Sequence, residues 1–288
     1  MFNPGYGGPE DRAVAMASCR TGGLGRRGPP PQRQTGKQCR MKHEIIRVRH
    51  ELRRRDLEVS RVEYPTPGML RMTLTGEELE GFHSPSADDH VKLFIPQPDG
   101  EPAMRDYTPR RYDAQTQSLV LDFALHDGGP ATLWARSAKE GDRLQIGGPR
   151  GSSIVPHDFD WWLMVGDETA LPAIGRRLEE FAPGTPVTTL VAVEGPEEEQ
   201  ALATQAAHRP LWVHRPLAAA SDPAPVLQAL ADLSLPEGEG FVWIAAESRV
   251  AKAVRAHVTD VWGHPKQWLK SSGYWKLGTK DSHEEFDD

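Results

Sequence analysis

Short apolar and alternating segments dominate the chain between residues 41 and 155. They are separated by clusters of proline, glycine, aspartate and serine, as at 65–68, 98–100 and 147–149. Runs of this length bounded by turn residues are typical of strands in a β-sandwich or a closed β-barrel. We therefore predict an antiparallel all-β domain with one helix at 130–138 and strands at 59–62, 70–74, 91–95, 119–125 and 143–146.

A different rhythm begins after residue 156. Apolar segments at 161–165, 187–193, 211–213 and 241–245 alternate with segments of helical periodicity at 171–181, 197–207, 224–233 and 249–261. Strands that alternate with helices of this length form βαβ units, in which helices cover the faces of a parallel sheet. The predicted fold class is thus a β-barrel plus α/β: a barrel domain over 41–155 and a parallel-sheet domain over 156–288.

The first forty residues differ from the rest in composition. They contain 8 Gly, 5 Pro, seven basic side chains and only two acidic ones. Such a stretch buries too little apolar surface to offset the entropy lost on ordering, so we expect it to be disordered. Met41 opens the regular pattern. The leader is therefore interpreted either as the product of a mis-chosen translation start or as a basic tethering tail.

Composition and charge exclude several classes of function. The 288 residues carry 34 basic and 41 acidic side chains; without the leader, 27 basic and 39 acidic ones remain, a net charge of −12. This balance argues against binding nucleic acid through its phosphates. No apolar run is long enough for a transmembrane helix. Both cysteines, Cys19 and Cys39, lie in the leader, so the body carries no thiolate chemistry. We expect a cytoplasmic monomer.

The first segment with candidate chemistry is Arg105-Asp106-Tyr107-Thr108. If it is a strand, the side chains of Arg105 and Tyr107 share one face and Thr108 points to the other. That combination offers a cation for a diphosphate, an aromatic face for a planar ring and a hydroxyl for a ring edge, as a flavin nucleotide requires. An ordinary Arg-Tyr pair on a surface strand has the same spacing, so both interpretations stay open at this point.

Two further segments place loops at the starts of helices. Gly128-Gly129-Pro130 precedes the helix predicted at 130–138, where exposed backbone N–H groups can face an anion. Residues 166–174 follow the strand at 161–165 and supply Asp and Thr caps at the edge of the sheet where ligands bind. Each signal is weak alone, because most Gly-Gly-Pro turns only cap helices and 166–174 contains a single glycine.

Taken in order, the segments resemble one family. The chain contains Arg-x-Tyr-Thr (105–108), His-x-x-Gly-Pro-Ala-x-x-Trp-Ala (126–135), Gly-Asp-x-Leu-x-x-x-Gly-Pro-Arg-Gly (141–151) and Gly-Asp-Glu-Thr-Ala-Leu-Pro-Ala (166–173). Together with 88–94 (Asp-Asp-His-Val-Lys-Leu-Phe) and Tyr274-Trp275, this series resembles the siderophore-interacting protein family, and in particular its FAD-dependent bacterial ferric-siderophore reductases. The resemblance runs from about Arg47 to Gly278.

The resemblance implies a ferredoxin-reductase-like fold with a flavin-binding barrel and a nicotinamide-binding α/β domain. By that likeness FAD contacts Arg105, Tyr107, Thr108, His126, Ala131, Thr132 and Trp134, and the path of NADPH or NADH is lined by Asp167, Glu168, Thr169, Ala170 and Glu247. Trp268, Tyr274 and Trp275 form an aromatic tail that either covers the flavin or closes the sheet, with Trp275 favoured as a site residue.

A basic substrate pocket is also implied by the family. The matching positions are Lys92, Arg150 and Lys270, with a lysine at 270 where other members carry arginine, which puts a bidentate contact in doubt. Catecholate-type ferric chelates are anionic, and a body of net charge −12 would repel them unless a local cationic patch reversed the field. Taken singly, each of the three residues could equally be solvated surface.

The chemistry supports the same hypothesis independently. A nicotinamide donates two electrons as a hydride, whereas ferric iron accepts one, and a flavin can receive the pair and release the electrons singly. Such a step needs no protein acid, base or nucleophile and no dedicated metal site. We therefore predict an NAD(P)H-dependent, FAD-containing reductase of ferric siderophores. The alternatives are a non-catalytic siderophore-binding protein and a flavin reductase that serves a protein partner.

Overall fold

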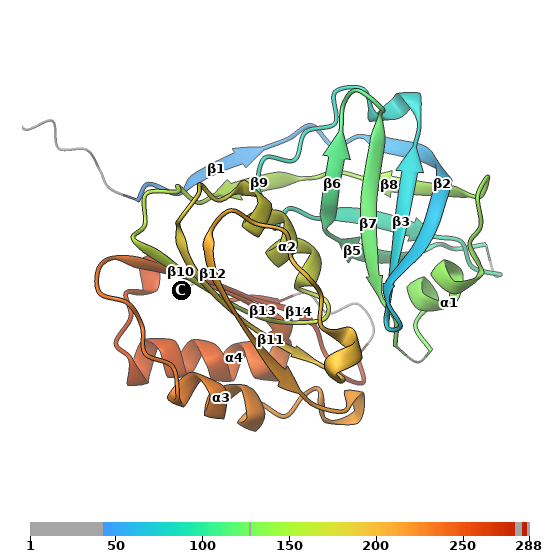
Figure 1. The fold of residues 1–288 in the computed structure, drawn as a ribbon. Helices are drawn as coiled ribbons and strands as arrows, with labels where there is room; N and C mark the ends of the chain where they lie inside the picture. Colours follow the sequence, from blue (N-terminus) through green and yellow to red (C-terminus); the bar gives the residue numbers. More distant parts are fainter. Residues whose placement is uncertain (1–42, 99, 127, 280–283, 287–288) are drawn as a thin grey trace, which may run out of the picture. The chain divides into compact units, whose positions relative to one another are not determined.

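The computed structural model describes residues 43–98, 100–126, 128–279 and 284–286, and residues 41–288 form one compact unit. The leader for which we predict disorder lies outside the described residues. The unit contains two large sheets and a two-stranded ribbon made by β1 (Ile46–Arg49) and β9 (Gly151–Ile154) (Figure 1). In the part of the chain that the structure describes, no helix has the length and apolar character needed to cross a membrane.

The first sheet is antiparallel and barrel-like. Its strand order is β5-β4-β8-β2-β3-β7-β6. Its two edge strands, β5 and β6, are separated in the chain only by Thr108, so the sheet must curve until its edges adjoin at that residue. The strands are β2 (Arg54–Thr66), β3 (Met69–Thr75), β4 (Val91–Ile95), β5 (Ala103–Tyr107), β6 (Pro109–Asp113), β7 (Ser118–Ala124) and β8 (Arg143–Gly147).

Period-two alternation explains why these segments are strands. Alternate side chains of β3 and β4 are buried, and together with Phe123 of β7 and Ile146 of β8 they form one apolar core. Helix α1 (Pro130–Ser137) packs against this core through Ala131 and Ala135. The antiparallel fold and the helix predicted at 130–138 are thereby confirmed.

The second sheet has the order β12-β11-β10-β13-β14-β15, and its first five strands are parallel. The chain enters at the central β10, runs outward through β11 and β12, and then returns to the other side with β13 and β14. This reversal is the topological switch point at which open α/β sheets bind ligands. The strands are β10 (Trp161–Asp167), β11 (Pro186–Val193), β12 (Ala207–His214), β13 (Gly240–Glu247), β14 (Leu269–Trp275) and β15 (Glu284–Glu285).

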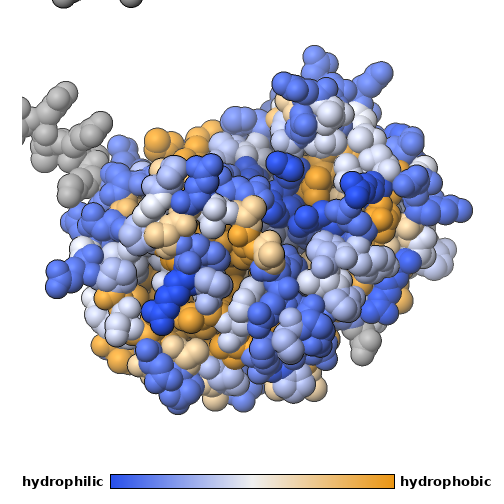
Figure 2. Space-filling model, viewed as in Figure 1, coloured by the Kyte–Doolittle hydropathy of each residue, from blue (hydrophilic) through white to orange (hydrophobic). Residues whose placement is uncertain are grey.

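Helices cover both faces of this sheet, as Figure 1 shows. Helix α2 (Leu171–Glu180) packs on the face that presents Trp162 and Met164 of β10. Helices α3 (Ala224–Ala231) and α4 (Ser248–Ala256) pack on the opposite face. Because neighbouring residues of a strand point to opposite faces, every residue of β10 and β13 is buried. Figure 2 shows a mostly hydrophilic surface interrupted by separate apolar spots.

One predicted helix is wrong. The segment 197–207 contains only a 3-10 turn, Pro196–Glu198, after which the chain is extended and enters β12 at Ala207. The Thr204 hydroxyl donates to the Leu178 carbonyl (2.6 Å) and accepts from the Ala206 amide (3.0 Å), which stabilises the extended path. The helix predicted at 249–261 is α4 followed by a π-helical turn, His257–Val261.

The predicted change from antiparallel to parallel architecture lies between β9 and β10, so the expected boundary near residue 156 falls in this connection. Six strands are not among those predicted: β1, β6, β9, β14 and β15, whose pattern is too weak, and β5, which the sequence indicates only as a conditional strand. In β6, for example, the sequence Pro-Arg-Arg-Tyr-Asp contains no apolar alternation. Such strands form because a neighbouring strand accepts them, not because their own pattern requires it.

Candidate functional site

The Arg-x-Tyr-Thr segment lies at the seam where the edges of the barrel sheet adjoin. Arg105 and Tyr107 belong to β5 and share one face, and Thr108 follows directly after the strand. The ring of Tyr107 packs on Phe123, with 4.5 Å between centroids, and burial raises the pKa of its hydroxyl. Because β5 and β6 do not pair with each other, the seam carries backbone groups that no sheet ladder uses.

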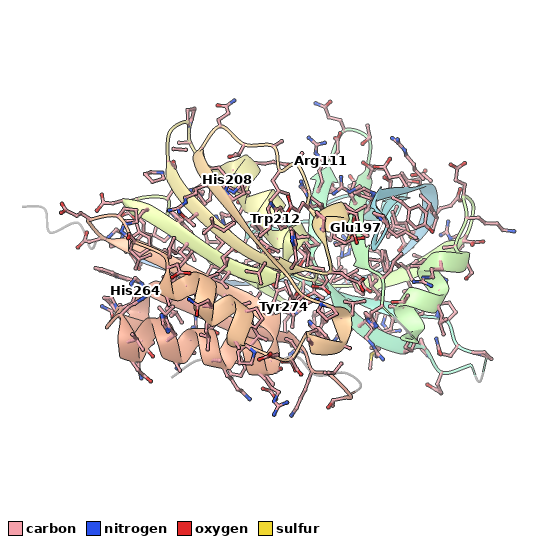
Figure 3. All side chains as sticks on the ribbon, turned by 60° about the horizontal axis from the view of Figure 1, so that its bottom comes forward. Arg111, Glu197, His208, Trp212, His264 and Tyr274 are labelled. Atoms are coloured by element: carbon pink, nitrogen blue, oxygen red, sulfur yellow. The ribbon has the colours of Figure 1, made fainter. Side chains whose placement is uncertain are left out.

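Thr108 connects the seam to the α/β half. It is buried, and its side chain shares a hydrogen bond with Tyr274 of β14. Burial raises the pKa of Tyr274, whose ring meets Trp243 of β13 edge-on with 6.2 Å between centroids. Figure 3 labels Tyr274 among the strands, well away from His264 at the far end of the sheet. The barrel and the parallel sheet therefore meet at Thr108 and Tyr274.

The start of α1 presents an anion site next to the seam. Gly129 is the N-cap and its helix has no side-chain cap, so the N–H groups of the first turn are available to a ligand. Gly128 has a φ of 82°, which favours glycine in this turn. Trp134 packs toward Phe123, the residue that also holds Tyr107 (6.2 Å between centroids). Ala131 and Thr132 are buried in the same turn.

This set of groups fits a flavin nucleotide. The uncapped helix start and the Arg105 guanidinium suit a diphosphate, the Tyr107 ring suits a planar heterocycle, and the Thr108 hydroxyl suits the polar edge of such a ring. The residues come from separate turns and strands that the barrel fold brings to one place.

A single buried carboxylate organises the switch point of the parallel sheet. Asp167 ends β10, and its Oδ1 accepts from the Thr169 amide (2.9 Å) and hydroxyl (2.5 Å). Its Oδ2 accepts from the Glu247 amide (2.8 Å) and from the Trp275 indole (2.9 Å). One side chain thus ties together the ends of β10, β13 and β14.

Trp275 is positioned by that bond beside His126. The two rings are parallel within 7°, with 6.4 Å between centroids. His126 lies in the connection after β7 of the barrel sheet, whereas Trp275 is the last residue of β14 in the parallel sheet. His126 itself is exposed, at the end of β7 and before α1. The structure therefore brings together two residues that the sequence assigns to the flavin, one from each half of the unit.

Glu247 supports the edge of the sheet from within. It is the last residue of β13 and is fully buried. Its Oε2 accepts from the amides of Arg249 (2.7 Å) and Val250 (3.4 Å), which caps α4, and its Oε1 accepts from the Leu277 amide (3.2 Å). Both oxygens of Glu247 are thus engaged by backbone groups of its own sheet edge.

A small pocket lies at the carboxyl edge of the sheet, among residues that include Gly166, Asp167 and Arg215. Arg215 donates to Glu168 at 2.5 and 3.2 Å, and burial together with the neighbouring Asp167 raises the pKa of Glu168 to about 7. A Cβ at Gly166 would lie 2.5 Å from that of Ala170, so the turn requires glycine. Among the predicted nicotinamide residues, Asp167 lines this pocket, and Glu168 is ion-paired with Arg215, which also lines it.

Two of the three cations assigned to the substrate are paired with carboxylates. The Lys270 ammonium lies 2.6 Å from Asp88, and the Lys92 ammonium 2.8 Å from Asp106. Arg150 is exposed, three residues beyond Gly147, the register partner of Lys92. Asp88 precedes β4, so its ion pair brings Lys270 of β14 to the loop that leads to Lys92.

Several residues of this region have no signal in the sequence. Asp88, which accepts from the Trp243 indole (2.9 Å), lies within the segment 88–94 but is not assigned a role there. Glu198, expected in a helix, accepts from the Thr66 hydroxyl (2.6 Å) and the Gly68 amide (2.7 Å) of the barrel hairpin. The structural roles of Asp88 and Glu198 depend on hydrogen-bond partners more than 100 residues away in the chain, so the local sequence does not indicate them.

A barrel seam bearing Arg-x-Tyr-Thr, followed by a parallel sheet whose switch point faces that seam, defines the ferredoxin-reductase-like class of flavin- and nicotinamide-dependent proteins. The chain matches the family model of the siderophore-interacting protein over residues 159–278. It matches the siderophore-interacting FAD-binding domain over 58–102 and 98–153. The chain belongs to the siderophore-interacting protein family and contains its FAD-binding domain, which confirms the predicted resemblance and the predicted cofactor.

Relatives and solved structures agree with this assignment. The chain is 37% identical over 250 residues to the NADPH-dependent ferric-chelate reductase of Escherichia coli, covering 80% of this chain and 95% of the relative. It is 29% identical to the ferric vibriobactin reductase of Vibrio cholerae, covering 85% and 97%. A siderophore utilization protein from T. fusca superimposes with a TM-score of 0.78 at 35% identity, covering 83% and 99%.

Proposed function

We propose that this protein is an FAD-containing reductase that uses NADPH to reduce ferric siderophores and so releases ferrous iron in the cytoplasm. The observation that carries the proposal is the contact of the barrel seam with the parallel sheet at Thr108 and Tyr274. It supports a site in which a planar cofactor and a nucleotide meet between the two halves. The names of the relatives from Escherichia coli and Vibrio cholerae supply the substrate class and the electron donor.

The roles of the residues follow from their chemistry. Arg105 and the start of α1 would hold the FAD diphosphate, Tyr107 would contact the ring, and Thr108 would donate to its polar edge. Bound FAD accepts a hydride and passes on single electrons. Asp167 and Glu247 keep the carboxyl edge of the sheet in shape, so the nicotinamide nucleotide can lie along it.

The reaction is tested with purified protein. We expect a yellow protein with about one FAD per chain, whose flavin absorbance bleaches on anaerobic addition of NADPH. Adding a ferric siderophore and a ferrous-specific chelator should then give two trapped ferrous ions for each NADPH consumed, because a hydride carries two electrons.

The two alternatives give different outcomes in the same assay. A siderophore-binding protein without activity would bind the chelate and consume no NADPH. A flavin reductase that serves a protein partner would bleach with NADPH and reduce free flavin, but it would form no ferrous iron from the chelate alone. A colourless protein that takes up no FAD would contradict the proposal as a whole.

A further inference from the structure

The cations of the substrate region are compensated by carboxylates in the folded protein. Lys270 and Asp88 form a close pair, 2.6 Å apart, with side chains that are 25% and 9% exposed. Asp88 also accepts from the Trp243 indole (2.9 Å) and the Ser86 hydroxyl (2.7 Å). Two further donors therefore converge on this ion pair, and the four groups come from three segments of the chain.

The neighbours of Asp88 stabilise its charged form. Burial alone would raise its pKa, but the adjacent Lys270 ammonium and the hydrogen bonds from Ser86 and Trp243 lower it well below the ordinary value. The positive charge of Lys270 is thus offset at every physiological pH. A ligand approaching this lysine meets the field of a dipole, which falls off faster with distance than that of a lone charge.

The second cation is compensated in the same way. The Lys92 ammonium lies 2.8 Å from both carboxylate oxygens of Asp106, its cross-strand partner on β5. These side chains are 42% and 22% exposed, so solvent screens this pair more than the pair of Lys270. Of the three substrate cations, only Arg150 has no ion-pair partner among the residues that the structure describes.

The rest of the chain after residue 40 has an excess of acidic side chains. After residue 40 the chain carries 27 basic and 39 acidic side chains. With one uncompensated cation, this body repels a polyanion and discriminates little against a neutral ligand. Three dianionic catecholates around Fe³⁺ leave three negative charges on the complex, whereas three monoanionic hydroxamates leave none.

On the basis of the proposed function, we propose that the crevice at Lys92, Arg150 and Lys270 takes ferric chelates of low or zero net charge, such as trihydroxamates, in preference to trianionic tris-catecholates. Asp88 and Asp106 set this preference by offsetting two of the three cations. This reverses the expectation from sequence, in which the same lysines form a cationic patch for an anionic chelate.

Binding is measured with gallium chelates, which have the charge and shape of the ferric complexes but are not reduced. Quenching of the flavin or tryptophan fluorescence of the FAD-loaded protein gives the Kd of a Ga³⁺ trihydroxamate and of a Ga³⁺ tris-catecholate. We expect the neutral chelate to bind at least about tenfold more tightly at low salt. Its Kd should change little with added salt.

Two substitutions test the cause. Asp106→Asn and Asp88→Asn each leave a lysine uncompensated, and each should shift the ratio of the two Kd values by about three- to tenfold toward the tris-catecholate. Glu63→Gln is the matched control, because Glu63 pairs with Arg61 at 2.6 Å. Glu63 lies on β2, nine residues after Arg54. Arg54 pairs with Gly147, and Gly147 also pairs with Lys92, so Glu63 lies well along the strand from the Lys92 position. Asp106→Asn decides the test if the buried Asp88 variant fails to fold.

The outcomes separate this inference from the proposed function. Equal or tighter binding of the tris-catecholate by the native protein, or an unchanged ratio in Asp106→Asn, overturns the inference even if ferric chelates are reduced. A shift of the same size in Glu63→Gln also overturns it, since the effect would then be one of net charge. If the gallium preference is found and no ferrous iron forms with NADPH, the charge preference stands and the reductase assignment fails.

Discussion

Buried carboxylates are the residues that hold the crevice in shape. Asp167 and Glu247 lie at the carboxyl ends of β10 and β13, Asp88 links the barrel to β13 and β14, and each accepts at least three hydrogen bonds. A buried charge is stable only when its oxygens are satisfied in this way. These residues therefore tolerate little change, although none of them needs to touch a substrate.

We expect Asp167→Asn to lower the free energy of unfolding by about 2 kcal/mol. All four groups around the carboxylate donate, so the amide NH₂ of asparagine would face at least one donor with another donor. Urea unfolding followed by tryptophan fluorescence measures the difference. Asp56→Asn is the control: Asp56 is about half exposed in its pair with Arg143, and its loss should stay within about 0.5 kcal/mol. An equal effect of both substitutions would contradict the assignment.

We expect Arg105→Ala to weaken FAD binding by about ten- to a hundredfold, because a charge-assisted contact to the diphosphate is removed. Titration of the FAD-free protein with FAD, followed by flavin fluorescence, gives the Kd directly. Arg136→Ala removes an exposed arginine from the last turn of α1 and should leave the Kd unchanged. FAD binding that is insensitive to Arg105 would place the diphosphate elsewhere.

At the scale of elements, the carboxyl edge of the sheet is built from loops, and one of them reaches the barrel. The segment 195–206 crosses from β11 to β12 without the usual helix, and Glu198 extends from it to the β2–β3 hairpin. A Cβ at Gly68 would lie 2.9 Å from the Glu198 carboxylate, so only glycine leaves room for this contact. The extended loop thus links the parallel sheet to the barrel hairpin.

We expect Glu198→Ala to speed hydrogen exchange of the Gly68 amide by about tenfold or more, since that amide loses the carboxylate to which it donates. Mass spectrometry of peptides covering 62–70 and 194–206 reports the change on both sides of the contact. Glu197→Ala removes the neighbouring exposed carboxylate and serves as the control. If both variants exchange alike, the loop is not held through Glu198.

At the scale of the whole molecule, contacts between distant segments fix the two halves of the unit. Arg110 of the barrel pairs with Glu179 of α2 at 2.6 Å, and Arg176 donates to the Ser84 and Pro109 carbonyls. The first described residue, His43, lies between Asp158 and Glu239, with ring nitrogens 2.7 and 3.1 Å from their oxygens. The start of the body is thus anchored to the entry of the parallel sheet.

His43 should make stability depend on pH. Burial against Phe159 lowers its pKa, but the hydrogen bonds and charges of Asp158 and Glu239 outweigh burial and raise it above 6.5. A raised pKa means stability that is fully present below the unfolded value and is lost as pH rises through the folded one. The unfolding free energy lost in His43→Gln should therefore be larger near about pH 5.5 than near about pH 8.5.

Urea unfolding at the two pH values measures this difference. The control is His214→Gln, because His214 forms an exposed pair with Glu199, with side chains 42% and 37% exposed, and contributes little at either pH. A loss that is constant or grows with pH would show that the imidazole is neutral between its carboxylates, and the anchor would then act by packing alone.

The sequence by itself determines the order of the elements and the ordered motifs. Period-two alternation in β3 and β4 and continuous apolar runs in β10 and β13 are local properties, so the barrel and the parallel sheet can be predicted from them. The segments around Arg105, Gly129 and Gly166 can likewise be recognised, because backbone turns and helix starts depend on neighbouring residues.

Only the tertiary structure decides which charges meet. From sequence, Lys270 is predicted to be a free cation, but in the structure it forms an ion pair with Asp88, 182 positions earlier in the chain. Glu198 is predicted to lie in a helix, but in the structure it accepts hydrogen bonds from the barrel hairpin. The physical reason is that an ion pair or a shared hydrogen bond depends on distance in space, about which sequence separation says nothing. The sequence therefore predicts which residue types form the candidate site, but only the tertiary structure shows which of their charges are compensated.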